Sequence, residues 1–300
     1  MGAFGFTSTV ANIKVAGLSS WSVRRAPLVS PDVGYYSLGN LADGKVTTNL
    51  LTKKDTKGYP IPYGITFEAS AKMLSTPKTT VLQLLDHLVD CPLIQKITAV
   101  NAVTFTGPWG FKWRFDSSAD YDGFRYIEVM ANDRFIISGT ARDWPDLLTT
   151  PATGSADAGD ALYAWVGGQN AIPAGMTAFE TRNLAESTWE TLGEFRNGKI
   201  VADCMTTLDN NGRYRTFGVH VTIEADMMQA SSTELALLDD VAVGVADLKA
   251  TMADGTTFTF ADNIGVSWSY HNETDSDGIS FIHLVGETYM TPAAFVGIIA

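Results

Sequence analysis

Residues 35–74 have the sequence YYSLGNLADGKVTTNLLTKKDTKGYPIPYGITFEASAKML, and a related segment follows 154 residues later. That second segment, residues 189–228, is WETLGEFRNGKIVADCMTTLDNNGRYRTFGVHVTIEADMM. Aligning residues 38–73 with 192–227 requires no gap and gives ten identities in 36 positions. The identical pairs include Leu38/Leu192, Gly39/Gly193, Gly44/Gly198, Lys45/Lys199, Asp55/Asp209, Gly58/Gly212 and Met73/Met227. The sequence therefore predicts that both segments share one fold.

The similarity continues beyond these segments. TVLQLLD at residues 80–86 resembles TELALLD at 233–239, and an Asp-x-Asp-Gly turn occurs at residues 120–123 and again at 275–278. Between the two halves, residues 139–160 have the Gly, Pro, Ser and Ala content of a linker. We therefore expect two tandem domains of ordinary size, residues 1–140 and 161–300, joined by a linker at 141–160.

Alternation of apolar and polar residues predicts the central strand of each copy. In residues 65–73 and 219–227 every second residue is apolar, a period typical of a half-buried antiparallel strand. A short amphipathic helix is expected after each strand, at residues 80–88 and 233–241, and then a hairpin with an Asp-Gly turn. The predicted fold is β-rich α+β, with two copies of a sandwich-forming or barrel-forming domain, each with one short flanking helix.

Charge is unevenly distributed along the chain. Residues 1–150 contain 15 Lys and Arg against 13 Asp and Glu, a net charge of +2, whereas residues 151–300 contain 6 against 20, a net charge of −14. Proteins hold nucleic acid mainly by neutralising its phosphates with Lys and Arg. The total of −12 argues against a protein that grips DNA, although DNA could still pass beside it.

Other features limit the class of protein. Cys91 and Cys204 fall at different places in the two copies, which supports neither a disulfide framework nor a zinc site. No signal peptide is recognisable, and no apolar run approaches the roughly 18 residues of a membrane helix. We expect a protein without a membrane segment, made in a reducing cytoplasm. Pro27, Pro31 and Gly34 predict an extended arm or a surface loop in residues 19–34 rather than a helix.

The sequence predicts no catalytic, cofactor or metal site. The histidines, at positions 87, 220, 271 and 283, lie in neither a nucleophile elbow nor a zinc-binding helix motif. Gly278 is the fourth residue from Asp275, as a hairpin turn needs, and not the sixth, as an EF-hand needs. The tryptophans are expected in the core or in subunit contacts rather than in a sugar-stacking platform.

The pattern Leu-Gly-x-x-x-x-Gly-Lys begins at Leu38 and again at Leu192. Together with the strand, turn, alternating strand, leucine-rich helix and final hairpin that follow, it resembles the major tail tube proteins of long-tailed bacteriophages. In that family a β-sandwich-like domain flanked by a helix forms rings of six, whose inner strands make a continuous barrel around the DNA channel. This chain departs from the simple pattern because it carries two such domains, as in a minority of flexible-tailed phages.

The resemblance implies a structural protein of the virion tail that is assembled in the host cytoplasm. Three chains would form a homotrimeric, pseudo-hexameric ring, and stacked rings would form a tube. The partners would be further copies of the chain and the tail completion and tail-tip proteins, with DNA passing through without specific binding during ejection.

The polar residues of the two alternating strands are the candidates for the lumen wall. They are Thr66, Glu68, Ser70 and Lys72 in the first copy and His220, Thr222, Glu224 and Asp226 in the second. They could instead face another solvated surface while a different strand lines the lumen. Three other functions stay open: a virion surface or capsid decoration protein, a carbohydrate-binding or hydrolytic module and a secretion-system tube protein.

Overall fold

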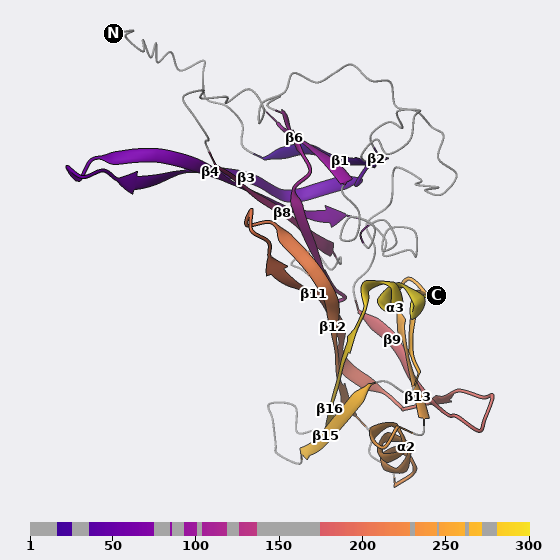
Figure 1. Ribbon diagram of the computed structural model, residues 1–300. Coiled ribbons are helices and arrows are strands. Elements are labelled where there is room, and N and C mark those ends of the chain that lie inside the picture. The colour runs from indigo at the N-terminus through magenta and orange to yellow at the C-terminus, as the bar shows by residue number, and fades with distance from the viewer. Residues whose placement is uncertain are drawn as a thin grey trace.

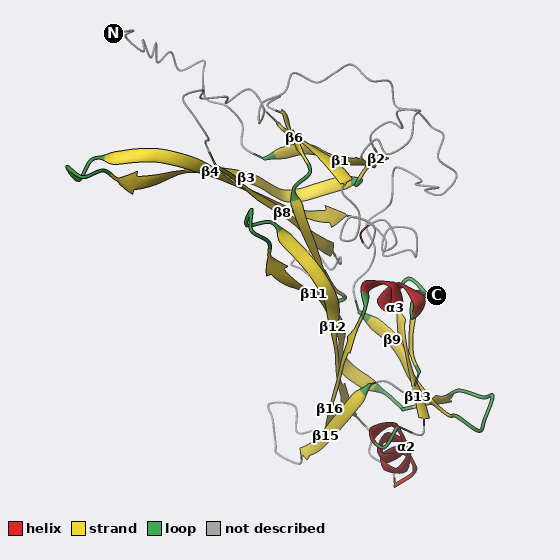
Figure 2. Cartoon of the chain, in the orientation of Figure 1, coloured by secondary structure: helices red, strands yellow, loops and turns green. Residues whose placement is uncertain are grey.

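The structure is a computed structural model that describes residues 17–25, 36–74, 85, 93–100, 104–118, 126–136, 175–228, 232–244, 246–261, 264–271 and 281–300. These residues form three antiparallel sheets, with helices α2 (Ser232–Ala242) and α3 (Pro292–Gly297) beside them (Figures 1 and 2). The predicted linker at 141–160, residues 161–174 and both Asp-Gly turns lie outside the described residues.

The largest sheet has eight strands and runs the length of the molecule (Figure 1). In spatial order they are β15 (Gly265–His271), β16 (Phe281–Met290), β12 (Tyr214–Met227), β11 (Phe195–Leu208), β7 (Gly110–Asp116), β8 (Tyr126–Ile136), β4 (Pro60–Leu74) and β3 (Asn40–Lys54). Strands β3 and β15 are therefore its two edges.

Two smaller sheets cover one face of the large sheet. The first consists of β2 (Tyr36–Ser37), β1 (Leu18–Arg25), β5 (Leu93–Ala99) and β6 (Thr104–Gly107). The second consists of β10 (Glu190–Thr191), β9 (Met176–Asn183), β13 (Ala246–Met252) and β14 (Thr257–Phe260). Aromatic contacts join the layers: the ring centroids of Trp21 and Phe111 are 6.1 Å apart, and those of Phe179 and Phe195 are 6.3 Å apart. The result is a β-sandwich, which confirms the β-rich part of the predicted fold.

The same turn closes both long hairpins of the large sheet. The Asp55 carboxylate accepts hydrogen bonds from the backbone N–H groups of Lys57 and Tyr59, each at 2.8 Å. Asp209 accepts equivalent bonds from Asn211 and Arg213, at 2.8 and 2.9 Å. Both turns end in a glycine with positive φ, 84° at Gly58 and 74° at Gly212, a conformation that costs glycine little.

The strand pairings in the two halves of the large sheet also correspond. Lys45 lies opposite Ser70 in the β3–β4 pair, and Lys199 lies opposite Glu224 in the β11–β12 pair. Each pair has two irregularities at matching places: residues 42–45 and 51–52 in β3, and residues 196–199 and 205–206 in β11. The order β3-β4-β8-β7 is repeated as β11-β12-β16-β15.

Some local expectations are confirmed and one is wrong. Helix α2 forms where the second leucine-rich segment predicts it, with Leu238 and Val241 buried. Of the first predicted helix only Leu85 is described, and it is helical and buried. Residues 18–25 are a core strand rather than an arm or loop, because the Trp21 and Val23 side chains are buried beneath the large sheet.

Candidate functional site: a polar sheet face and two open edges

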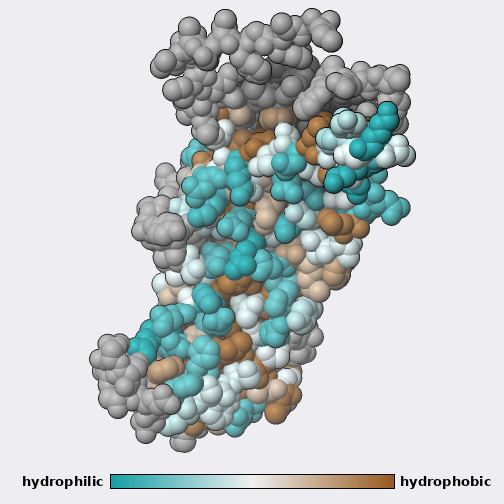
Figure 3. Space-filling view, turned by 90° about the vertical axis from the view of Figure 1, so that its left-hand side faces the viewer, coloured by the Kyte–Doolittle hydropathy of each residue, from teal (hydrophilic) through white to brown (hydrophobic). Residues whose placement is uncertain are grey.

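The eight residues proposed for the lumen lie on one face of the large sheet. They alternate along β4 and β12 with buried residues such as Phe67 and Val221, which point into the sandwich. Strands β4 and β12 are not neighbours, because β8, β7 and β11 lie between them. Figure 3 views the molecule from the left-hand side of Figure 1, and hydrophilic residues cover much of this surface, with separate apolar patches between them.

Asp226 is the most enclosed of the eight, with 9% of its surface exposed. Its carboxylate accepts a hydrogen bond from Asn197 Nδ2 at 2.8 Å and lies 2.8 Å from His283 Nδ1. Arg196 Nε is 3.8 Å away. These partners cover the carboxylate and fix its position, so Asp226 contributes less free carboxylate surface to the polar face than its place in the strand predicts.

His220 belongs to a second cluster that sequence reasoning missed. Its Nε2 lies 2.6 Å from Glu287 Oε1, and the Tyr289 hydroxyl donates a hydrogen bond of 2.7 Å to the same oxygen. The His220 and Tyr289 rings stack with centroids 4.5 Å apart. The hydrogen bond from Tyr289, followed by that from His220, lowers the pKa of Glu287. The register between β12 and β16 places His220 directly opposite Tyr289 and Thr222 opposite Glu287, so Glu287 is the diagonal neighbour of His220.

Five cations on this face are held by neighbouring side chains. Lys72 Nζ lies 3.2 Å from Asp43, Lys199 Nζ lies 2.9 Å from Glu224, and Arg114 lies 3.1 Å from Asp203. Two more lie over aromatic rings, Lys112 over Tyr214 at 4.7 Å and Arg134 over Tyr63 at 5.9 Å. Because each of these five charges already has a partner, the face has a mixed and largely compensated charge, which offers weak binding to phosphate groups.

Strands β7 and β11 join the two halves of the large sheet. Their register places Asp116 opposite Val201, Phe115 opposite Ala202 and Arg114 opposite Asp203. The joint continues past β7, where the backbone N–H of Ser117 donates to the Ile200 carbonyl at 2.9 Å. The two halves thus share one hydrogen-bonded sheet.

The tip of the β11–β12 hairpin docks on β8 of the first half. The Asn132 amide donates to the Gly212 carbonyl at 2.7 Å and accepts from the Tyr214 N–H at 2.8 Å. Gly110 allows this approach, because a Cβ there would lie 2.2 Å from the Tyr214 nitrogen. The glycine and the amide therefore form a seat for the hairpin.

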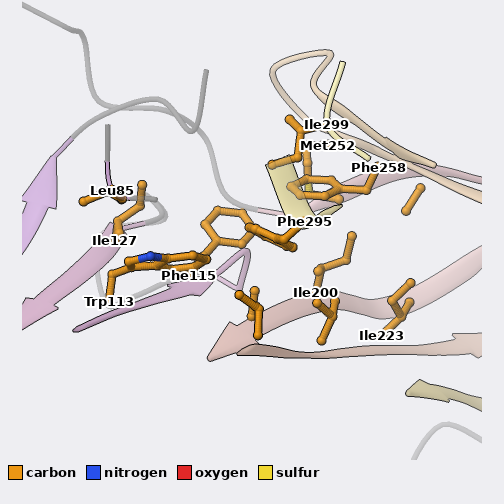
Figure 4. Close-up of a cluster of buried hydrophobic side chains, with 14 of the residues drawn as sticks. Leu85, Trp113, Phe115, Ile127, Ile200, Ile223, Met252, Phe258, Phe295 and Ile299 are labelled. Carbon is orange, nitrogen blue, oxygen red and sulfur yellow. The ribbon is translucent and has the colours of Figure 1, made fainter. Parts of the chain in front are cut away.

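Aromatic side chains extend the core across the joint. Trp113 and Phe115 of β7 are at most 1% exposed and pack on residues of the second half (Figure 4). Trp113 lies 5.3 Å from Phe295 and Phe115 lies 5.6 Å from Phe258, measured between ring centroids. Cys204 of β11 lies partly buried here, and burial raises the pKa of its thiol to about 12.

The two edges of the large sheet, by contrast, leave large apolar side chains exposed. On β15, Trp268 is 37% exposed and Tyr270 is 53% exposed. On β3, Leu50 is 52% exposed, and Tyr59 at the hairpin tip is 65% exposed. An unpaired strand with apolar residues readily pairs with another chain.

Within the described ranges, no group of three or more His, Cys, Asp or Glu residues is arranged to hold a metal ion. None of the helices in that part of the chain is both long and apolar enough to span a membrane. No protein-family model matches the chain, and no curated protein is significantly similar to it.

Proposed function

We propose that this chain is the structural protein of a bacteriophage tail tube, in which three chains form a pseudo-hexameric ring and rings stack around a channel for DNA. The observation that carries the proposal is the β7–β11 joint. It connects the last strand of the order β3-β4-β8-β7 to the first strand of the order β11-β12-β16-β15. We infer that these halves are two copies of one domain, so the same kind of joint between β15 and β3 of successive chains closes a ring.

The size of such a ring supports the proposal. Three chains contribute 24 strands, 8 from each large sheet. With strands about 4.8 Å apart and tilted by about 40°, the barrel is roughly 48 Å wide between backbones, which leaves room for duplex DNA after side chains are counted. A barrel of eight strands from a single chain would be filled by its own side chains. Here those would be the charged residues of the polar face, and removing them from water would be unfavourable.

The same arrangement assigns the two faces. The apolar face is covered by the smaller sheets, so the polar face with Glu68, Thr222 and Glu224 is the inner wall in this proposal. Five of its cations are held by carboxylates or aromatic rings, which limits the contacts that the wall makes with DNA phosphates. In this proposal DNA passes because the wall is polar and hydrated, its charges are largely compensated, and it binds DNA phosphates only weakly.

Electron microscopy of the purified protein at high concentration tests the proposal. We expect end-on views of hollow rings with six similar lobes and a mass of three chains, together with side views of stacked tubes. A compact oligomer without a central hole would overturn the proposal and favour a capsid decoration or carbohydrate-binding protein.

A further inference from the structure

We infer that β15 of one chain pairs with β3 of the next in the register that β7 and β11 use within a chain. This register places His271 opposite Thr47, Tyr270 opposite Thr48 and Ser269 opposite Asn49 of the neighbour. The inference rests on the proposed function, and it names the partner surface and the residue pairs that close the ring.

The register follows from correspondence between the halves. Strand β15 corresponds to β7 at an offset of 155 residues, since Gly110 lies opposite Asn132 and Gly265 lies opposite Glu287. Strand β3 corresponds to β11 at an offset of 154 residues. Applying these offsets to the observed Phe115–Ala202 and Arg114–Asp203 pairs gives the Tyr270–Thr48 and Ser269–Asn49 pairs.

Gly265 gives an independent reason to expect a neighbouring hairpin at this edge. At the corresponding Gly110, a Cβ would strike the backbone of Arg213 and Tyr214 at 2.8 and 2.2 Å, so docking of the hairpin requires glycine. At Gly265 a Cβ would meet only the Glu287 carbonyl oxygen, at 3.4 Å, which is ordinary van der Waals contact. Contacts within the chain do not require glycine there, whereas a hairpin tip from the next chain would.

The hairpin that would occupy this seat is the β3–β4 tip. By the same offset, Tyr59 and Pro60 correspond to Arg213 and Tyr214, and Tyr59 is well exposed in the single chain. Pro60 has no N–H, so the bond from Tyr214 to Asn132 has no counterpart, and Glu287 replaces that asparagine. The tip carries Lys53, Lys54 and Lys57, which complement the acidic second half that receives it.

The exposed apolar residues of the two edges also match. Leu50 corresponds to Cys204, and Trp268 corresponds to Trp113, which places Leu50 directly opposite Trp268 on the sandwich side of the joint. Within the chain the equivalent Trp113 is buried and Cys204 is partly buried, whereas Leu50 and Trp268 are 52% and 37% exposed. Tyr270 would pack on Phe105 of the next chain as Phe115 packs on Phe258. Pairing of the edges thus covers both apolar patches.

Matched glycine substitutions test the inference. We expect Gly265→Ala to leave the thermal unfolding midpoint of the dispersed chain unchanged but to abolish rings and tubes in electron micrographs. Gly110→Ala should lower the unfolding midpoint of the chain itself, because its seat is filled within the same molecule. Gly265→Ala protein that assembles as the wild type does would overturn the inference.

Disulfide cross-linking tests the register directly. Directly opposite residues have Cα atoms about 4.5–5.5 Å apart, within disulfide range, whereas diagonal neighbours two residues away are about 7–8 Å apart. Oxidation of assembled Asn49→Cys/Ser269→Cys protein with oxidised glutathione should yield a covalent trimer on non-reducing gels. The diagonal pair Asn49→Cys/His271→Cys and the wild-type chain with its own two cysteines are the controls, and both should stay uncross-linked.

The outcomes separate the two proposals. Three-chain rings without the Asn49–Ser269 cross-link, or with more cross-linking in the diagonal pair, would reject the register while leaving the tube function intact. Wild-type protein that forms no rings at its highest attainable concentration, together with Asn49→Cys/Ser269→Cys protein that shows no cross-link above the controls, would count against both. Rings together with a selective covalent trimer would support both.

Discussion

Arg213 Nε donates a hydrogen bond of 2.8 Å to Asp133 Oδ1, and the Asp133 side chain is completely buried. Arg213 lies in the turn of the β11–β12 hairpin and Asp133 lies in β8, so this ion pair connects residues of the two sequence halves. The hydrogen bond with Asp133 raises the pKa of the guanidinium. A buried carboxylate that loses its cation has neither water nor an opposite charge to stabilise it.

Arg213→Met should therefore lower the free energy of unfolding by about 3 kcal/mol, because it leaves the Asp133 carboxylate buried in the joint without a positively charged partner. Arg215→Met is the matched control, since Arg215 pairs with Asp209 at a more exposed position, and its loss should cost less than about 1 kcal/mol. Urea denaturation of the dispersed chains measures both values. Equal effects of the two substitutions would show that the ion pair does not secure the joint.

Asp209 should give the chain a stability that depends on acid pH. Burial alone would raise the pKa of this carboxyl, but hydrogen bonds from the N–H groups of Arg213 and Asn211, and from Arg215, outweigh burial and lower it. Because the folded pKa lies below the ordinary value of 3.8, the stabilisation is full above that value and is lost as the pH falls through the folded pKa. Asp209→Asn should flatten the dependence of the unfolding free energy on pH below about 4, measured by denaturation at a series of pH values. An unchanged slope would contradict this.

Cys204 should be chemically inert in the folded chain. Burial raises its pKa from 9.0 to about 12, which reduces the thiolate fraction at neutral pH about a thousandfold. Alkylation with iodoacetamide at pH 8, followed by peptide mass spectrometry, should therefore label Cys204 only after urea is added. Rapid labelling of Cys204 in the native chain would mean that the β7–β11 joint opens readily.

The polar face can be tested in assembled tubes by labelling a single introduced cysteine. Thr222→Cys in a tube should react with a small maleimide but not with a maleimide attached to a polymer too large to enter the lumen. In dispersed chains both reagents should react. Val243→Cys, at a strongly exposed position next to α2, is the control outside the polar face and should react with both reagents in tubes. Reaction of the large reagent at residue 222 in tubes would place another surface at the lumen.

The sequence predicts the local elements well where the pattern is strong. Strict alternation from Ile65 to Met73 specifies both the strand and its buried face, and the Asp55 and Asp209 turns follow from side chains that cap their own backbone. Strand β1 was missed because the prolines after it outweighed the alternation of Trp21 and Val23. A short strand that packs as a second layer has too few residues for its period to stand out.

Contacts between distant segments could not be predicted in the same way. The repeat indicates that β7 and β15 are equivalent, but only the structure shows that β7 pairs with β11, while among the described residues β15 pairs only with β16. The His220–Glu287–Tyr289 cluster likewise depends on the register between β12 and β16, which are separated by a helix and three strands. The significance of Gly110 and Gly265 becomes visible only when their surroundings are compared.

The β7–β11 joint also determines how the proposed ring responds to concentration. Association of free molecules costs on the order of 4–15 kcal/mol in translational and rotational freedom, whereas segments of one chain avoid this cost. Three of the six joints then form during folding, before any chain meets another. By mass action, the population of complete rings varies with the third power of the chain concentration, whereas six separate domains would give the sixth power. A protein with this built-in joint therefore begins to assemble at a lower concentration than six separate domains would need.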